Sequence, residues 1–399
     1  MANVVILGGG FAGVAATLRL LRHKDQNISV TLISENEFHL FTPSLYEVAT
    51  MEEPRRNIAL PYREIFGRNV RVLKSGIRAV HYAEKTVVLT DGKKVPFDYC
   101  IASLGSEQAY FHIPGLSEHS LVLKTLSDAV HMKKTIEDGF KKAAENKTQF
   151  QVLIGGGGFT GTELAGELVE CRKHLVKIYH AEDVPFSISV IQGSLLPLKD
   201  LDDEVGNIAA SRLSREGVTF ITNQHIKVVK AGSLTTDKGK TYPFDILVWT
   251  GGVKANHILR DSGFPVNPKR QVLVNEYLEI KDHPGMFAAG DCAAFAIGTT
   301  GNFAPGVAQV AEEEGAVAGE NVWRSIHNKS FAPYRFRHFG YVVPMTGRFA
   351  VAELGFIRLT GVFGWMLQQL VLLWYLLHIL PFWKAFRRWD RFEVNLKQE

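Results

Sequence analysis

Cysteine is scarce in this chain, which has three in 399 residues: Cys100, Cys171 and Cys292. They form neither a C-x-x-C nor a C-x4-C pair, and no group of histidines and cysteines has the spacing of metal ligands. The sequence therefore predicts no disulfide redox centre and no metal site. Each cysteine is expected to be a small buried residue rather than a reactive thiol.

The sequence also lacks a large excess of charge of one sign. The net charge is +4 and no basic stripe accompanies it, which argues against nucleic acid as a partner. Apolar residues make up 46% and charged residues 22%, the balance of a globular protein with length for two domains. The first residues, MANVVILGGG, lead directly into a strand pattern. We therefore expect no signal or transit peptide and a reducing, cytoplasm-like compartment.

A glycine loop near the N-terminus organises the rest of the chain. The apolar run at residues 4–7 is typical of a strand buried on both faces, and residues 14–21 predict a helix. Between them lies G-x-G-x-x-G, in the strand–helix context that dinucleotide binding requires. The residues expected to surround a pyrophosphate are Gly8, Gly9, Gly10, Phe11, Ala12 and Gly13. The glycines allow a tight turn, close backbone approach and close helix packing, and the helix N-terminus favours the anion.

The second strand is predicted at residues 28–34. An acidic residue at the end of this strand would accept hydrogen bonds from the adenosine ribose. Ser34 occupies the usual position and Glu35 follows it, and both residues remain candidates. The next stretch, residues 38–47, is aromatic and contains Pro43. It either lines a flat cofactor or forms an ordinary loop-and-helix packing segment.

The opening pattern occurs a second time. Residues 4–13 align with residues 152–161 at an offset of 148, and the sequence Pro-Phe-Asp at 96–98 recurs at 243–245 at an offset of 147. Two strands, two glycine loops and two closing strands in the same order indicate a tandem duplication of a nucleotide-binding domain. Between them the sequence predicts a hairpin at Asp91-Gly92, a linker at residues 106–124 and an amphipathic helix at residues 127–146.

Two dinucleotide sites in one chain imply a specific chemistry. One dinucleotide stays bound as a flavin, and the other arrives and leaves as a nicotinamide that carries hydride. The protein then has to hold nicotinamide C4 close to flavin N5 and to exclude side reactions.

A Gly-Asp pair distinguishes the two sites. With Gly290-Asp291 following both loops, the chain resembles the two-dinucleotide-binding-domain flavoproteins, in which this Asp contacts the ribityl chain of FAD. The resemblance implies an α/β fold with two Rossmann-like domains. The FAD domain would be split (1–112 and 266–330) around an inserted NAD(P)H domain (113–265), and a C-terminal membrane-associating helical region (331–399) would follow. FAD is expected non-covalently at the first loop, and NADH or NADPH at the second.

Longer stretches are similar to the type II NADH:quinone oxidoreductases, single-chain NADH dehydrogenases of the respiratory chain that pump no protons. These stretches are FHLFTPSLYEVAT (38–50), GGGFTGTELAGEL (156–168), VWTGGVKAN (248–256), GDCA (290–293) and AQVAEEEG (308–315). The resemblance covers nearly the whole chain. It implies hydride transfer from NADH, and from NADPH if it is accepted, to FAD. Electrons then pass to a membrane quinone and give quinol.

The family positions carry over residue by residue. Glu163, two positions after the second glycine loop, is expected near the flavin and the nicotinamide. A carboxylate there would orient the nicotinamide carboxamide or relay a proton toward quinone. The alternative is that Glu163 and Glu167 merely favour the helix dipole. The other positions assigned to the cofactors are Pro43, Ile77, Gly156, Gly158, Phe159, Gly161, Gly252, Asp291 and Ala308.

Gln192 ends the second strand of the second domain, where a strictly NADH-using member of the family has Glu. A carboxylate accepts hydrogen bonds from both ribose hydroxyls and repels a 2′-phosphate, whereas an amide repels nothing. The sequence therefore predicts relaxed discrimination against NADPH, without specificity for it, because no adjacent arginine is supplied.

Ala308-Gln309 matches the family pair that lies against the isoalloxazine beside the quinone pocket, which assigns Gln309 a catalytic role. Four residues on, family members often have a second Gln, and this chain has Glu313. A charge in a quinone slot is costly unless it is solvated or protonated. The type of quinone and the shape of its pocket therefore stay open.

The most hydrophobic stretch is the C-terminal tail at residues 359–383. Gln368, Tyr375 and His378 are expected on one narrow face of a helix that Pro381 ends. Four of the six tryptophans (Trp365, Trp374, Trp383 and Trp389) and four cations (Lys384, Arg387, Arg388 and Arg391) lie in or beside it. This pattern predicts a peripheral, monotopic helix on the cytoplasmic surface of a membrane through residues 359–391. A buried core or dimer helix and a spanning helix are the alternatives, and a homodimer stays open.

Two other functions compete with quinone reduction by NADH. Sulfide:quinone oxidoreductases need cysteines flanking the flavin, including one in the C-terminal region, and this chain has none after Cys292. An NAD(P)H-sensing flavoprotein with little quinone turnover is the second alternative, because Glu313 replaces the amide expected beside the quinone.

Overall fold

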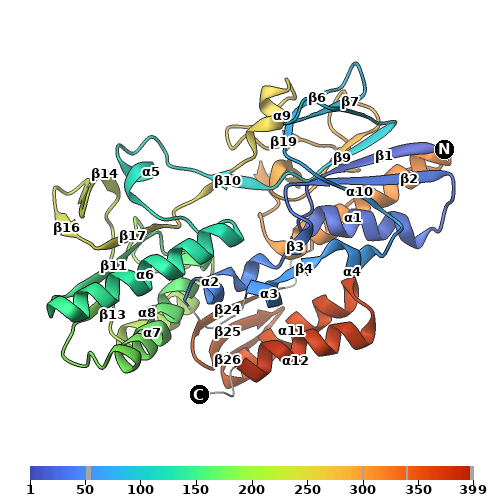
Figure 1. Ribbon diagram of the computed structural model, residues 1–399. Helices are drawn as coiled ribbons and strands as arrows, with labels where there is room; N and C mark the ends of the chain where they lie inside the picture. The colour runs from blue at the N-terminus through green and yellow to red at the C-terminus, as the bar shows by residue number, and fades with distance from the viewer. Residues whose placement is uncertain (51–54, 299–300, 338–339, 396–399) are drawn as a thin grey trace.

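The computed structural model describes residues 1–50, 55–298, 301–337 and 340–395, and of residues 55–56 and 391–395 it describes the backbone alone. Figure 1 shows three parts packed against one another: a sheet near the N-terminus, a second sheet with its helices, and a C-terminal part that is drawn below the first and beside the second.

The first sheet is parallel, with the strand order β20-β9-β1-β2-β5. Its strands are β1 (Ala2–Leu7), β2 (Ile28–Ser34), β5 (Arg71–Lys74), β9 (Tyr99–Ala102) and β20 (Met286–Ala288). The strands β9 and β20 pair with one another, although the whole second sheet lies between them in the sequence. The second unit is therefore inserted into the first. Helices α1 (Phe11–Arg22) and α10 (Ala308–Ile326) approach closely, since a Cβ on Gly315 would lie 2.1 Å from the carbonyl oxygen of Ala12.

The second sheet is also parallel, with the strand order β13-β12-β11-β17. Its strands are β11 (Phe150–Gly155), β12 (Phe186–Ile191), β13 (Val218–Ile221) and β17 (Ile246–Trp249), and its helices are α6 (Leu126–Asn146), α7 (Phe159–Tyr179) and α8 (Asp203–Arg215). Thr125 and Asp128 form a capping box that starts α6 one residue before the predicted helix. Two parallel sheets with helices confirm the expected α/β class with two Rossmann-like units.

Smaller elements connect these sheets. The strands pair in six small groups: β3 (Phe38–Leu40) with β4 (Ala59–Pro61); β6 (Ile77–His81), β7 (Thr86–Leu89) and β8 (Lys94–Pro96); β10 (Ser106–Gln108) with β18 (Val253–Ala255); β14 (Ile226–Lys230), β15 (Ser233–Thr236) and β16 (Thr241–Pro243); β19 (Val272–Leu273) with β21 (Ala293–Ala294); and β22 (Ala296–Ile297) with β23 (Asn302–Phe303). The short helices are η1 (Thr42–Ser44), α2 (Leu45–Ala49), α3 (Arg55–Ile58), α4 (Tyr62–Phe66), α5 (Leu116–His119), α9 (His257–Asp261) and η2 (Gly290–Cys292).

These elements test two predictions. The hairpin expected at Asp91-Gly92 is confirmed, because this dipeptide turns β7 into β8. The linker expected at residues 106–124 connects β9 of the first unit to α6 of the second, and it is partly structured, because it contains β10 and α5. The strand β10 pairs with β18, so the segment that leaves the first unit is hydrogen-bonded to the segment that returns to it.

The C-terminal part is an antiparallel sheet followed by two helices. The strands are β24 (Tyr341–Thr346), β25 (Phe349–Leu354) and β26 (Ile357–Gly361), and the helices are α11 (Val362–Ile379) and α12 (Phe382–Asn395). The helix expected from residue 359 therefore starts later, because Leu359 and its neighbours pair with β25. Gly361, with φ of +70°, turns the strand into the helix, and Pro381 separates α11 from α12 as predicted.

This C-terminal part contacts both dinucleotide units (Figure 1). Against the second unit, α7 meets β24, where the Thr346 hydroxyl donates to the Glu170 carboxylate at 2.7 Å. Against the first unit, the Arg388 guanidinium on α12 donates to the Glu64 carboxylate at 3.0 Å. The tail therefore helps to set how the two units face one another.

Helix α11 has one packed face and one exposed face. Leu372, Tyr375, Leu376 and Ile379 are buried. The exposed apolar residues are Val362, Phe363, Met366, Leu370, Val371, Trp374 and Leu377. By length and composition α11 could cross a membrane, with a mean hydropathy of 1.5 and 22% of the segment buried.

The three polar residues expected on one face of this helix differ in their exposure. His378 is exposed, whereas Gln368 is half-buried and Tyr375 is buried because its hydroxyl bonds to a residue of the first unit. Among the tail cations, Arg388 turns toward the protein, and Arg391 lies outside the described side chains. Trp374 and Trp383 are exposed, as a membrane-facing surface requires.

Candidate active site

The first glycine loop lies between β1 and α1. Gly8 has φ of +98°, and a Cβ there would lie 2.2 Å from the Ser103 carbonyl oxygen. A Cβ on Gly13 would lie 1.9 Å from the Gly8 carbonyl oxygen. Both positions therefore need glycine, one for the turn and one for the helix packing, as the fingerprint predicts.

The second loop, between β11 and α7, has the same geometry. Gly156 has φ of +115°, and a Cβ on Gly161 would lie 1.9 Å from the Gly156 carbonyl oxygen. The Thr250 hydroxyl donates to the Gly156 carbonyl oxygen at 2.9 Å, as the Ser103 hydroxyl does to that of Gly8 at 3.0 Å. The repeat seen in sequence is thus also a repeat of hydrogen bonds.

Both loops fit a pyrophosphate. A Cβ on Gly10 or on Gly158 would meet no atom within 4 Å, and these residues are the N-caps of α1 and α7. The open space therefore lies where the free N–H groups of each helix point. The side chains of Phe11 and Ala12 are buried, so these two residues have only their backbone to offer a ligand.

At the end of β2, Ser34 and Glu35 differ in whether their side-chain oxygen is exposed and able to accept a hydrogen bond from a ligand. Ser34 is buried, and its hydroxyl lies 3.1 Å from the Tyr62 hydroxyl. Glu35 is exposed, and its carboxylate lies 3.5 Å from where a Cβ on Gly76 would be. The Glu35 carboxylate is therefore open to solvent, whereas the Ser34 hydroxyl already bonds within the protein. Ile77, which follows Gly76 and opens β6, is half-buried beside it.

Asp291 has partners that the sequence did not reveal. The Ser106 hydroxyl donates to its carboxylate at 2.5 Å, and the Lys124 ammonium lies 3.9 Å from it. Lys124 also donates to the Ser106 hydroxyl at 2.7 Å. Ser106 and Lys124 are the first and last residues of the predicted linker, and no local sequence pattern indicates that either is functional.

Gln192 lies under the second glycine loop. It is buried, and a Cβ on Gly157 would lie 1.6 Å from its side-chain oxygen. Its amide nitrogen donates to the Ser194 carbonyl oxygen at 3.4 Å. An uncharged side chain therefore follows β12, at the position where a strictly NADH-using member of the family has Glu.

Glu163 lies in the first turns of α7, close to the first unit. Burial raises the pKa of the Tyr46 hydroxyl on α2, and the charges of Glu47, Glu163 and Glu167 raise it further, so these groups share one interface. Burial raises the pKa of Glu163 to about 8. At neutral pH its carboxyl is therefore protonated and has a proton to donate.

Helix α10 carries three consecutive carboxyls, Glu312, Glu313 and Glu314, and Glu313 stands where family members often have a second Gln. Burial raises the pKa of Glu313, although a hydrogen bond with Gln309 and the charge of Arg337 oppose the change. Burial also raises the pKa of Glu312 and of Glu314 to about 8. Glu314 accepts a hydrogen bond from the Gly290 N–H at 2.7 Å, beside Asp291. Ala308 and Gln309 are half-buried at the N-terminal end of this helix.

The remaining predicted residues occupy the edges of the two loops. Pro43 is exposed in η1, and Phe159 is half-buried at the start of α7. Gly252, with φ of +151°, accepts hydrogen bonds at its carbonyl oxygen from Ala109 N–H (3.1 Å) and from the Gln108 amide (2.8 Å). This glycine therefore links the end of the second unit to the segment through which the chain leaves the first.

The three cysteines take no part in this arrangement. Cys100, Cys171 and Cys292 are buried and form no disulfide, which confirms the expectation from sequence. Burial raises the pKa of Cys292 to about 12 and that of Cys100 further still, so neither is a thiolate at neutral pH.

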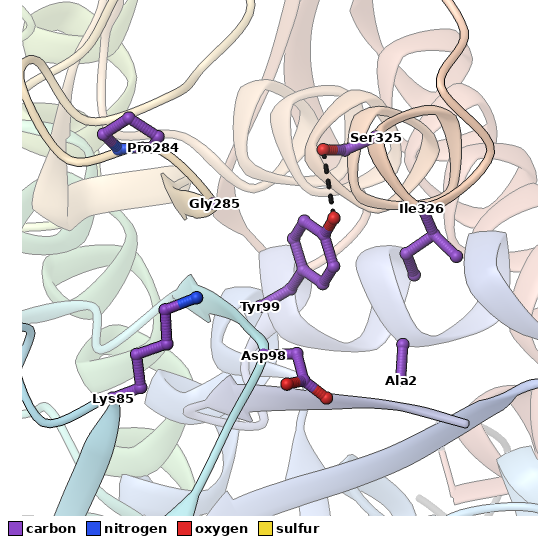
Figure 2. A pocket seen from close by; sticks show the side chains of 8 residues that line it. All are labelled: Ala2, Lys85, Asp98, Tyr99, Pro284, Gly285, Ser325 and Ile326. Atoms are coloured by element: carbon purple, nitrogen blue, oxygen red, sulfur yellow. Dashed lines mark hydrogen bonds between the residues drawn. The ribbon is translucent and has the colours of Figure 1, made fainter.

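A depression of about 540 Å³ lies at the other edge of the first sheet (Figure 2). Ala2, Tyr99 and Gly285 line it, at the amino ends of β1, β9 and β20. The Tyr99 hydroxyl and the Ser325 hydroxyl lie 3.3 Å apart across it. Because nucleotides bind at the carboxyl ends of parallel strands, this depression is separate from the glycine loops.

Comparison with known proteins agrees with this geometry. Residues 2–315 match the family described as pyridine nucleotide-disulphide oxidoreductase. The type II NADH:quinone oxidoreductase NdhA of Mycobacterium tuberculosis is 29% identical, over 95% of this chain and 83% of that protein. The demethylphylloquinone reductase NdbB of Synechocystis sp. is 25% identical, over 93% and 91%. The structure of NDH2 from Plasmodium falciparum in complex with NADH has a TM-score of 0.86 at 19% identity, covering 100% of this chain and 98% of that one, which establishes the fold.

Proposed function

The chain belongs to the pyridine nucleotide-disulphide oxidoreductase family, and from this premise we propose that it is a type II NADH:quinone oxidoreductase. It takes hydride from NADH, or from NADPH, onto FAD and passes the electrons to a membrane quinone. The three cysteines are buried and form no disulfide, so no disulfide carries the electrons. The domain boundaries 1–112 with 266–330, 113–265 and 331–399 are part of this proposal.

The observation that carries the proposal is the pair of matched glycine loops with Glu163 between the two units. Gly10 and Gly158 leave open space at two helix N-termini, so each unit has a place for one pyrophosphate. When bound, FAD supplies the acceptor for hydride and the donor for quinone. The residues of the chain hold the two dinucleotides and move protons, and Asp291, Glu163 and Gln309 are assigned to these tasks.

Stopped-flow absorbance at the oxidised-flavin band tests the proposal. The holoenzyme is mixed anaerobically with NADH or NADPH, and a soluble quinone is then added. Rapid bleaching followed by rapid recovery is expected. Bleaching without recovery would favour the NAD(P)H-sensing alternative, and no bleaching by either nucleotide would show that the second glycine loop does not bind nicotinamide.

Gln192→Glu should make the enzyme more selective for NADH. A carboxylate would repel the 2′-phosphate of NADPH, while the ribose of NADH would keep its hydrogen bonds. We expect the ratio of kcat/KM for NADH to that for NADPH to rise at least about tenfold, which corresponds to roughly 1.4 kcal/mol. Gln192→Ala is the control and should leave the ratio near that of the wild type. A wild-type preference for NADH above about a thousandfold would contradict the assignment.

The exposed face of α11 is the proposed membrane-docking surface, on the cytoplasmic side of a membrane. Leu370, Trp374 and Phe363 are each more than half exposed on this face. Arg387, on α12, is exposed as well, and it is suited to anionic headgroups. Because the opposite face of α11 packs on the protein, a helix lying along the surface fits better than a spanning one. The geometry also gives a long-tailed quinone a route from the bilayer.

Replacing Leu370 and Trp374 by Gln should release the protein from vesicles. Each removed apolar side chain forfeits roughly 1.5–3 kcal/mol of burial, so binding to phosphatidylglycerol vesicles should weaken at least about tenfold. The paired control is Ile178→Gln with Leu195→Gln, which are exposed on the second unit, and it should bind as the wild type does. Co-sedimentation measures both, and undiminished binding of the first pair would refute the docking surface.

A further inference from the structure

The carbonyl oxygen of Gly9 accepts two hydrogen bonds from inside the protein. The Tyr62 hydroxyl donates to it at 2.9 Å, and His39 Nδ1 lies 3.2 Å from it. A carbonyl only accepts, so His39 Nδ1 carries the proton. Two donors from different elements therefore fix the orientation of the peptide that joins Gly9 to Gly10.

The orientation of this peptide matters for the ligand side of the loop. In a trans peptide the N–H points opposite to the C=O. With the Gly9 oxygen held inward, the Gly10 N–H points outward, toward the space where a Cβ on Gly10 would meet no atom within 4 Å. That space is the one assigned above to a pyrophosphate. The donors to Gly9 thus preorganise a donor for the anion.

The other nitrogen of His39 is bonded to the C-terminal helix. The Tyr375 hydroxyl on α11 lies 2.6 Å from His39 Nε2. His39 is fully buried, and this burial lowers its pKa to about 4, so the ring is neutral and Nε2 accepts. The chain of bonds therefore runs from the Tyr375 hydroxyl through His39 to the Gly9 carbonyl.

Aromatic packing holds Tyr375 at this place. Its ring centroid lies 5.2 Å from that of Phe11 and 5.3 Å from that of Phe41. Phe11 in turn meets the His39 ring edge-on at 4.8 Å. Phe11 is the residue after Gly10, so the Tyr375 ring packs directly on the glycine loop, and the Tyr375 hydroxyl reaches the loop through His39.

From this arrangement we propose that Tyr375 is a positioning residue for the flavin, so that retention of FAD depends on helix α11 being seated on the first unit. The inference rests on the proposed function in one respect, that the first loop binds FAD. It adds that the helix with the membrane-docking face is itself part of the flavin site. By linkage, bound FAD also tightens the seating of this helix.

Tyr375→Phe tests the proposal, because it keeps the ring and its packing and removes only the hydroxyl. Loss of one buried hydrogen bond should make FAD dissociate about fivefold faster. The rate of dissociation is measured by flavin fluorescence after dilution of the holoenzyme. Tyr99→Phe is the control: its hydroxyl bonds Ser325 at the opposite edge of the same sheet, and it should retain FAD as the wild type does.

Two further measurements separate positioning from general stability. The gain in thermal midpoint that saturating FAD confers should be smaller in Tyr375→Phe than in the wild type, whereas a merely structural role would lower both midpoints equally. In a His39→Leu background, Tyr375→Phe should cause no further acceleration, because the chain of bonds is already broken.

The proposal is overturned if Tyr375→Phe releases FAD no faster than Tyr99→Phe, or if its effect persists undiminished beside His39→Leu. A wild-type protein that binds FAD and is bleached by NADH would leave the proposed function standing in either case. A wild-type protein that binds no FAD would overturn both.

Discussion

Gly166→Ala should destabilise the protein, although the substitution alone favours a helix. Gly166 lies within α7, and a Cβ there would lie 1.0 Å from the Met345 carbonyl oxygen and 2.2 Å from its carbon. These atoms belong to the backbone of β24, so no side-chain rotation relieves the overlap. We expect the free energy of unfolding to fall by about 3 kcal/mol, against a gain of about 1 kcal/mol from helix propensity.

Thermal unfolding of the holoenzyme checks this expectation. The midpoint should fall by about 5 °C or more, and turnover should fall with it because α7 carries Glu163. Lys177→Ala is the control, an exposed position of the same helix that should shift the midpoint by no more than about 1 °C. A midpoint that rises in Gly166→Ala would mean that α7 and β24 separate without cost.

The glycine loops could be predicted from sequence because their geometry is local. A positive φ at Gly8 and at Gly156, and close helix packing at Gly13 and Gly161, are required within a few residues of the chain. The predicted second strand, residues 28–34, matches β2 in full. Burial on both faces of a parallel strand leaves an unbroken apolar run, and such runs are readable without any tertiary information.

The partners of these loops could not be predicted in the same way. Tyr375 and His39 are separated by 336 residues, and Lys124 reaches Asp291 from a segment without a clear period. Contacts of this kind depend on how complete units dock, and no spacing in the sequence encodes them. The stretch at residues 38–47 is aromatic, but nothing in its sequence distinguishes His39 from its neighbours.

The tail shows how an apolar run conceals a boundary. Leu359 and its neighbours continue the hydrophobic stretch, yet they pair with β25 because a strand and a buried helix face are both apolar. Gly361 was the available signal for the change from strand to helix. The spacing of Gln368, Tyr375 and His378 predicts a shared helical face, but it does not predict which of them is buried. Tyr375 is buried, and its hydroxyl lies 2.6 Å from His39 Nε2 of the first unit.

Glu163→Gln should slow quinone turnover at neutral pH by about a hundredfold, the size of effect typical of a lost proton donor. Glutamine can still donate a hydrogen bond to the nicotinamide carboxamide, but it has no acidic proton. Flavin reduction by NADH should therefore persist, and reoxidation by quinone should slow. Stopped-flow traces of the two half-reactions separate these steps. Glu182→Gln, an exposed carboxyl of the same unit, is the control, and unchanged turnover in Glu163→Gln would contradict the assignment.

The same variant should become relatively more stable at high pH. The pKa of Glu163 is about 8 in the folded protein against 4.5 for the free side chain. Between these values the folded state binds more protons than the unfolded chain, so its stability falls as pH rises through this window. Glutamine cannot ionise and escapes this loss, which amounts to as much as about 1.4 kcal/mol per pH unit. Denaturation at pH 6 and pH 8.5 should therefore show that the free energy of unfolding of the variant, relative to that of the wild type, is higher at pH 8.5 than at pH 6, while its turnover stays low. A variant equally destabilised at both pH values would mean that the carboxyl is ionised in the folded protein and that Glu163 holds no proton to give.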